Sequence, residues 1–233
     1  MPFDLLSPAV TALLVESLQE TAYMVSVAAL VSTALGLPLG VLLVVTAPGH
    51  ILAAPIFNRI LSVAINLIRS TPFIILMVAI IPFTRFVSGS SVGTSAAIVP
   101  LTVAITPLFA RLAESAMREV DRGLIEAAEA IGASPLQIIT RVIFPEALPG
   151  IVAGQTVALV SLISYSAMAG TVGGGGLGDL GVRYGYQRFM PEVMVAVVVV
   201  LVVIVQSVQL IGDAVARAVN HRIARSKRAA SQV

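Results

Sequence analysis

The run VMVAVVVVLVVIVQSVQLI, residues 193–211, decides the kind of fold that this chain can adopt. It carries no charged side chain over a length that matches the roughly 20 apolar residues of a membrane-spanning helix. Because backbone amides cannot be left unpaired in hydrocarbon, such a run predicts a helix. The composition agrees: 58% of the 233 residues are apolar and 11% are charged, with a mean hydropathy of +1.00. These values exclude an ordinary soluble domain, in which about 25% of residues are charged.

Four further apolar stretches predict an all-α membrane protein with five transmembrane helices. The second stretch contains Arg69, which makes its ends the hardest to place. A polar segment, residues 113–146, separates the third stretch from the fourth, and a basic tail, residues 214–233, follows the fifth. We expect a single membrane domain over residues 1–233, with spans at residues 23–45, 60–83, 94–112, 149–169 and 193–211.

The arginine and lysine residues of the loops predict the orientation. With the N-terminus outside, eleven basic residues fall on the inner side and three on the outer side, so residues 113–146 and the C-terminal tail are expected in the cytoplasm. The inner set is Arg59, Arg69, Arg111, Arg118, Arg122, Arg141, Arg217, Arg222, Arg225, Lys227 and Arg228, and the outer set is Arg85, Arg183 and Arg188.

Two short helices are predicted within the cytoplasmic segment. Residues 124–131 are mostly good helix formers, and Gly132 stands where a left-handed stop is expected. Ser134 and Gln137 have the spacing of a capping box and predict the start of a second helix, which we expect Pro145 to break. A helix pair of this size has no core of its own, so it must pack on the membrane helices and can present its other face to a partner.

The same segment resembles the EAA motif of permease subunits in binding-protein-dependent ABC importers. Glu126-Ala127-Ala128, Gly132 and the run Val142-Ile143-Phe144-Pro145 carry the likeness, with Phe144 in place of the usual leucine. The resemblance implies a type I importer permease fold in which the first short helix is a coupling helix, seated in a groove of a separate ATPase. It implies that the docking residues are Glu126, Ala127, Ala128, Gly132 and Pro145.

Further segments are similar to the permeases of methionine importers in particular: residues 69–76, 81–85, 165–168, 173–178 and 184–186. This resemblance covers roughly residues 21–219. It implies a homodimer in the bacterial cytoplasmic (inner) membrane, with two ABC ATPase subunits inside, a solute-binding lipoprotein outside and membrane lipid around it. ATP and magnesium are expected on the ATPase, and no cofactor on this chain.

Catalytic, metal and nucleic-acid functions find no support in the sequence. Residues 173–178 fit G-x-G-x-x-G, but the strand and soluble βαβ unit that a dinucleotide site needs are missing from the pattern. The G-x-G-D pattern ending at Asp179 has no second aspartate in the middle of a span, as an intramembrane aspartyl protease requires. The chain contains no cysteine and no phosphate-loop motif, and its net charge of +2 is too small to indicate nucleic acid. If transport uses ATP, another polypeptide must bind it.

The fourth apolar stretch is the least apolar and is the candidate translocation path. Small residues at Gly150, Gly154 and Ala158 allow close helix packing, which favours an interface between subunits. The alternative is that residues on one helix face line the path; the two interpretations are compatible in a homodimer. Arg69 either extends its side chain to the inner interface, pairs with Glu114 or lines the cytoplasmic mouth. The path candidates are Gly154, Ser161, Ser164, Tyr165, Met168 and Arg69.

The sequence therefore predicts the membrane subunit of an ATP-driven importer for methionine, including D-methionine and related amino acids, working by alternating access. Alternatives are a permease of this class for another amino acid or small solute, an ATP-independent carrier or channel, and a membrane anchor that recruits a cytoplasmic partner.

Overall fold

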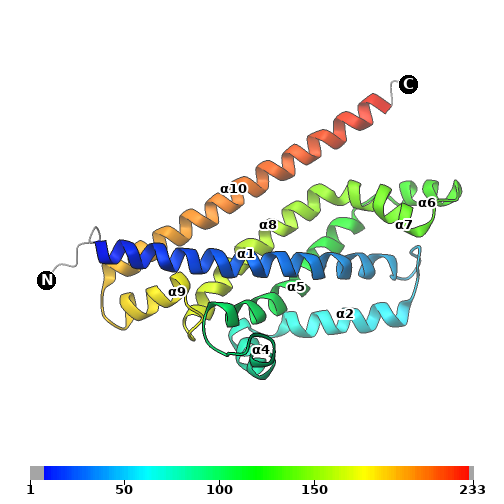
Figure 1. Ribbon diagram of the computed structural model, residues 1–233. Coiled ribbons are helices and arrows are strands. Elements are labelled where there is room, and N and C mark those ends of the chain that lie inside the picture. The colour runs from blue at the N-terminus through cyan, green and yellow to red at the C-terminus, as the bar shows by residue number, and fades with distance from the viewer. Residues whose placement is uncertain (1–7, 231–233) are drawn as a thin grey trace. The chain divides into compact units, whose positions relative to one another are not determined.

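The computed structural model describes residues 8–230, and every regular element within that range is helical (Figure 1). The segments labelled η are π-helical. In chain order the elements are α1 (Pro8–Val45), α2 (Pro55–Ser70), α3 (Phe73–Ala79), α4 (Ile81–Ser88), α5 (Thr94–Arg118), α6 (Arg122–Ala130), α7 (Pro135–Ile138), η1 (Ile139–Ile143), α8 (Phe144–Gly170), α9 (Gly176–Leu180), η2 (Gly181–Tyr186) and α10 (Pro191–Ala230).

Four helices among the described residues are long and apolar enough to cross a membrane. They cover Val10–Val45, Thr94–Arg118, Pro135–Gly170 and Pro191–Asn220. The last of these is α10, of whose most apolar stretch only 6% is buried within the chain. The predicted basic tail continues this helix to Ala230, whereas residues 231–233 and the side chains of residues 221–230 lie outside the described part.

The second predicted span, residues 60–83, is not one helix. Helices α2 and α3 meet at a 105° bend, and they satisfy the length and apolarity of a span only as a pair. The break falls at Thr71 and Pro72, because proline has no N–H to donate and disfavours helical backbone in the residue before it. At Pro72 the backbone is extended, with ψ at 136°.

The described residues form two compact units. The first contains Ile68–Ile105, Ala158–Val208 and the described residues up to Ser32, and its core includes Val10, Leu177, Leu180, Val193 and Val197. The second contains Thr33–Leu67, Thr106–Val157 and the described residues from Gln209, with Leu43, Ile65 and Ala110 in its core.

Small residues let α1 and α5 approach closely in the second unit. A Cβ atom added at Gly40 would stand 2.8 Å from the carbonyl oxygen of Ala110 and 3.0 Å from the Cβ of Ala113. Contacts this short with backbone cannot be relieved by a side-chain rotation, so the backbones themselves would have to separate.

Gly40→Leu is therefore expected to lower the stability of the permease fold by about 1 to 3 kcal/mol, the usual cost of an overpacked interior. Leu35→Phe is the matched control on α1, since the side chain of Leu35 is exposed. Thermal unfolding in detergent measures both, and an equal loss in the two variants would contradict the packing argument.

Candidate functional site

The first helix of the predicted pair begins and ends on local hydrogen bonds. The side chain of Asp121 accepts a hydrogen bond of 2.7 Å from the amide of Gly123, which caps the start of α6. At the other end Gly132 has φ of +79°, as predicted. The amides of Gly132 and Ala133 donate to the carbonyls of Glu129 and Ala128, the pattern of a Schellman motif.

The second helix begins with the predicted capping box. The Ser134 hydroxyl accepts from the amide of Gln137, and the Gln137 side chain accepts at 2.8 Å from the amide of Ser134. Because both helix ends carry these bonds, the turn between α6 and α7 is held by its own sequence. In the second unit α6 and α7 contact each other, and both contact η1.

The prediction that Pro145 breaks the helix is wrong. Residues Ile139–Ile143 form a π-helical turn, after which the amide of Phe144 donates to the carbonyl of Ile139, and α8 begins. Pro145 is the second residue of α8, which follows directly after this π-helical turn. The helical path therefore runs without interruption from Pro135 to Gly170.

The helix pair presents an exposed surface that is partly apolar. Glu126, Ala127 and Gly132 are exposed, whereas the side chains of Ile125 and Ala128 are buried at 8% exposure. Two larger apolar residues stand out: Ile131 is 85% exposed and Leu136 is 69% exposed. We call Leu124, Glu126, Ala127, Ile131, Gly132 and Leu136 the elbow surface. Its three large apolar members, Leu124, Ile131 and Leu136, belong to the predicted helix pair but not to the docking residues that the resemblance implies.

The loop between α1 and α2 contacts the elbow, by which we mean α6, α7 and the turn between them. The loop and the elbow both belong to the second unit. The Arg122 guanidinium lies 3.5 Å from the Gly49 carbonyl, and a cavity of about 240 Å³ is lined by His50, Arg118 and Arg122 among others. Burial lowers the pKa of His50, and the positive charges of Arg122 and Arg118 lower it further, against a smaller opposite effect of Glu129. His50 is therefore held in its neutral form.

A buried carboxylate on α5 ties two helices of the second unit together. Glu114 is 5% exposed and is bound by Arg111 at 2.6 Å and by Arg118 at 2.8 Å. Arg111 also donates at 3.2 Å to the Ser62 carbonyl and to the Asn66 side chain, both on α2. Sequence reasoning had weighed only Arg69 as a partner of Glu114. The spacing of three and four residues from Glu114 to its arginines was the available signal.

The path candidates are divided between the two units. In the second unit, a Cβ atom on Gly154 would stand 3.0 Å from the Cβ of Leu112, and one on Gly150 would stand 2.8 Å from the Cβ of Ala116. These glycines of α8 thus pack against α5 of the same chain. Their small size is already explained by that contact.

The remaining path candidates lie in the first unit. Tyr165 stacks on Phe73 of α3, with ring centroids 4.7 Å apart and planes 2° from parallel. Met168 is 42% exposed, Ser164 is exposed and Ser161 is partly buried. Arg69 is exposed in the last turn of α2.

Two residues of α1 hold the glycine-rich segment that follows α8. The Glu20 carboxylate accepts at 2.6 Å from the amide of Gly176, and the Thr21 hydroxyl accepts at 2.9 Å from the amide of Leu177. The Gly173 carbonyl accepts from the amide of Gly93 at 2.8 Å. The glycine-rich segment, residues 173–178, is thus a turn followed by the start of the short helix α9, fixed within the first unit.

Comparison with known proteins assigns the chain to a protein family. The sequence profile of one family, described as the binding-protein-dependent transport system inner membrane component, matches residues 36–225. The chain belongs to this family. It is a multi-pass inner-membrane permease subunit of an ABC transporter.

Known permeases are similar to this chain over nearly its full length. The probable D-methionine transport system permease protein MetI of Vibrio cholerae is 53% identical over 210 residues, which cover 90% of this chain and 93% of the relative. The protein of the same name from Pasteurella multocida is 46% identical, over 93% of this chain and 100% of the relative. A chain of the MetNI methionine ABC transporter in an inward-facing conformation superposes with a TM-score of 0.90 and 48% identity, over 92% of this chain and 99% of that chain.

Glu114→Ala is expected to destabilise the permease by about 3 kcal/mol, because it leaves two arginines without their shared carboxylate. The value lies at the low end for a broken buried ion pair, since about half of the Arg118 side chain stays in solvent. Glu119→Ala, at an exposed carboxylate on the following turn, is the control. Equal thermal unfolding of the two variants in detergent would disprove the role of Glu114.

The lowered pKa of His50 predicts a pH dependence of stability. Between its folded-state pKa and its unfolded value of about 6.5, the unfolded chain binds more protons, so stability falls as the pH drops through this window. The unfolding temperature is measured at about pH 7.5 and about pH 5.5. Its drop between these two pH values should be larger for the unmodified protein than for His50→Gln. Parallel losses would show that His50 does not contribute.

Proposed function

We propose that this permease is the membrane subunit of an ATP-driven methionine importer, taking up D-methionine and related amino acids as well. The observation that carries the proposal is sequence identity over at least 90% of the chain. The identity is 53% to a probable D-methionine transport permease and 48% to a chain of a methionine ABC transporter. Alternating access between outward and inward openings is the transport mechanism that fits this class.

The elbow surface is the proposed docking site for the ATPase. Apolar side chains as exposed as Ile131 and Leu136 are unusual next to water and are typical of a protein interface. Glu126 adds a charge that a cationic group of the partner can meet, and Ala127 permits close approach. Ala128 and Pro145 take part through the fold of the elbow and of α8, since Ala128 is buried within the chain.

The elbow is built to transmit motion. The turn between α6 and α7 is held by the Schellman motif and the capping box. From there α7 continues through η1 into α8. Leu136 lies on the continuous helical segment of 36 residues that carries Tyr165 and Met168, and α6 contacts α7 and η1 of that segment. A displacement at the elbow surface is therefore passed to this segment. ATP drives transport in this scheme only if it favours one arrangement of the ATPase pair over the other, because equal binding to both shifts nothing.

The assembly we propose is a permease homodimer with two ABC ATPases inside and a solute-binding lipoprotein outside, in a lipid bilayer of the bacterial inner membrane. ATP and magnesium belong to the ATPase. Counting α2 and α3 together as one bent span gives five spans, with the N-terminus outside and the elbow and C-terminus in the cytoplasm. This orientation rests on the eleven-to-three distribution of basic residues. A single membrane domain over residues 1–233 is part of the proposal, and the family match to residues 36–225 supports it.

Purification from the native host in mild detergent, followed by uptake of radiolabelled methionine into proteoliposomes, tests the proposal. The complex should contain an ATPase and should import methionine only when ATP and the binding protein are present. Flux through the permease alone, driven by an ion gradient, would favour a carrier or channel. A bound partner without any solute flux would favour a membrane anchor.

Glu126→Lys is expected to weaken ATPase docking and lower ATP-driven uptake about tenfold or more, because it reverses the charge of the elbow surface. Glu192→Lys, an exposed charge reversal in the first turn of α10, is the control.

Gly132→Trp should weaken docking and uptake in the same way, with Gly89→Trp as its control. Both glycines have φ near +77° and open space around a Cβ atom, so backbone strain is matched. Copurified ATPase and uptake are the measurements, and full uptake by Glu126→Lys would refute docking at this surface.

A further inference from the structure

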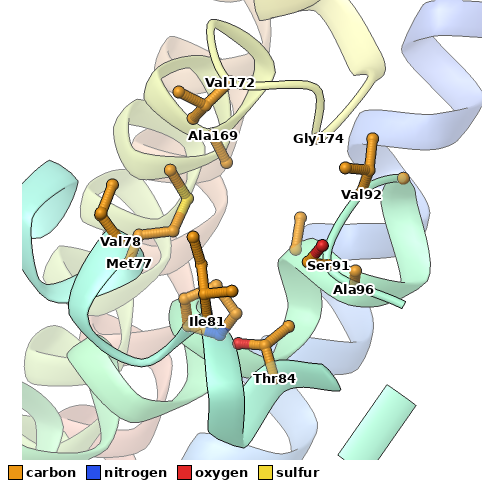
Figure 2. A pocket seen from close by; sticks show the side chains of 13 residues that line it. Met77, Val78, Ile81, Thr84, Ser91, Val92, Ala96, Ala169, Val172 and Gly174 are labelled. Carbon is orange, nitrogen blue, oxygen red and sulfur yellow. The ribbon is translucent and has the colours of Figure 1, made fainter. Parts of the chain in front are cut away.

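A cavity of about 190 Å³ lies inside the first unit, between α3, α4, the start of α5 and the end of α8 (Figure 2). Its wall is almost wholly apolar and includes Met77, Val78, Ile81, Ala96 and Ala169. Val92 and Val172 stand at its rim with exposures of 62% and 48%, so the cavity is open to the outside of the chain. None of the described residues that line it is charged.

One hydroxyl in this wall lacks a partner. Thr84 on α4 is 4% exposed, and its Oγ1 atom has no hydrogen-bond partner among the described residues. Figure 2 shows its side chain in the cavity wall beside Ile81. A buried hydroxyl without a partner is unfavourable and is uncommon in folded proteins. Because Thr84 lines the cavity, a molecule bound there is a candidate partner for this hydroxyl.

The unpaired hydroxyl is not a general property of threonine in this chain. In helices a threonine hydroxyl usually donates to the carbonyl four residues earlier. Thr46, Thr140 and Thr156 do this, with distances of 2.6, 2.7 and 3.0 Å. The carbonyl four residues before Thr84 belongs to Ile80 and accepts the amide of Thr84 at 2.8 Å. The Thr84 hydroxyl is thus left available at the cavity.

We propose that this cavity binds the thioether side chain of the transported amino acid, with the Thr84 hydroxyl donating to the sulfur. The inference rests on the proposed methionine import. An apolar cavity of about 150 Å³ holds one benzene molecule, so 190 Å³ suits an unbranched chain of three carbons and a sulfur. The thioether is apolar with one weak acceptor, which matches a mostly apolar wall in which the Thr84 hydroxyl lacks a partner. The charged amino and carboxylate groups stay at the open rim.

A lipid acyl chain is the competing occupant. It would match the apolar wall equally well, but it has no acceptor and would leave the Thr84 hydroxyl unpaired. Norleucine, in which a methylene group replaces the sulfur of methionine, separates the two possibilities. It has the shape of the proposed ligand and lacks the acceptor.

Thr84→Val removes the hydroxyl at nearly constant volume, and Thr84→Ser keeps it. ATP-driven uptake of methionine and of norleucine is measured in the complete transporter with one preparation of binding protein, so that its own selectivity cancels. The preference for methionine should fall about two- to tenfold in Thr84→Val, the worth of one hydrogen bond, and should remain in Thr84→Ser. An unchanged preference in Thr84→Val overturns the assignment and leaves an acyl chain as the occupant.

The absence of cysteine from the chain allows a second test that does not depend on uptake. Ser91 lines the cavity and Ser90 beside it does not. In Ser91→Cys, methionine should slow modification by a small thiol reagent, and in Ser90→Cys it should not. Equal rates with and without methionine in both variants overturn the proposal, even if Thr84→Val fails to assemble.

The two proposals fail in different ways. If the unmodified complex imports no methionine with ATP, the proposed function is wrong. If the complex imports methionine, but Thr84→Val leaves its preference for methionine unchanged or methionine does not slow the modification of Ser91→Cys, only the assignment of the cavity is wrong.

Discussion

The structure depends on one constraint, that backbone amides and carbonyls in apolar surroundings must find partners within the chain. Long helices satisfy it directly, and each interruption is repaired locally. After the break at Pro72, the Pro72 carbonyl accepts from the amide of Leu76. In the glycine-rich segment, Glu20 and Thr21 accept from amides at the start of α9. Irregular backbone occurs at these places because polar partners are supplied there.

The same requirement explains the form of the elbow. The α6 end is satisfied by the Schellman bonds to Ala128 and Glu129, and the α7 start by Ser134 and Gln137. With these groups paired, the exposed surface is free to be apolar at Ile131 and Leu136. The π-helical turn η1 then carries the chain past Pro145 into α8. Leu136 of the elbow surface thereby belongs to the same continuous helical stretch as α8.

Polar side chains within the two units serve different ends. Glu114 is buried but neutralised by two arginines, so it fixes α5 against α2. The hydroxyl of Thr84 is equally buried but has no partner among the described residues, which makes it a recognition group and not a structural bond. Burial alone does not distinguish these roles; the presence or absence of a partner does.

The sequence by itself determined the membrane class, the long helices and the elbow, because these follow from apolar run length and from capping residues within a few positions of one another. It also indicated the family through the Glu126 to Pro145 pattern. Only the tertiary structure decided that Pro145 lies inside a helix, that Gly150 and Gly154 pack on α5, and that Thr84 lines a cavity. These features depend on contacts between residues distant in the chain, and hydropathy and spacing carry no information about which distant side chains will meet.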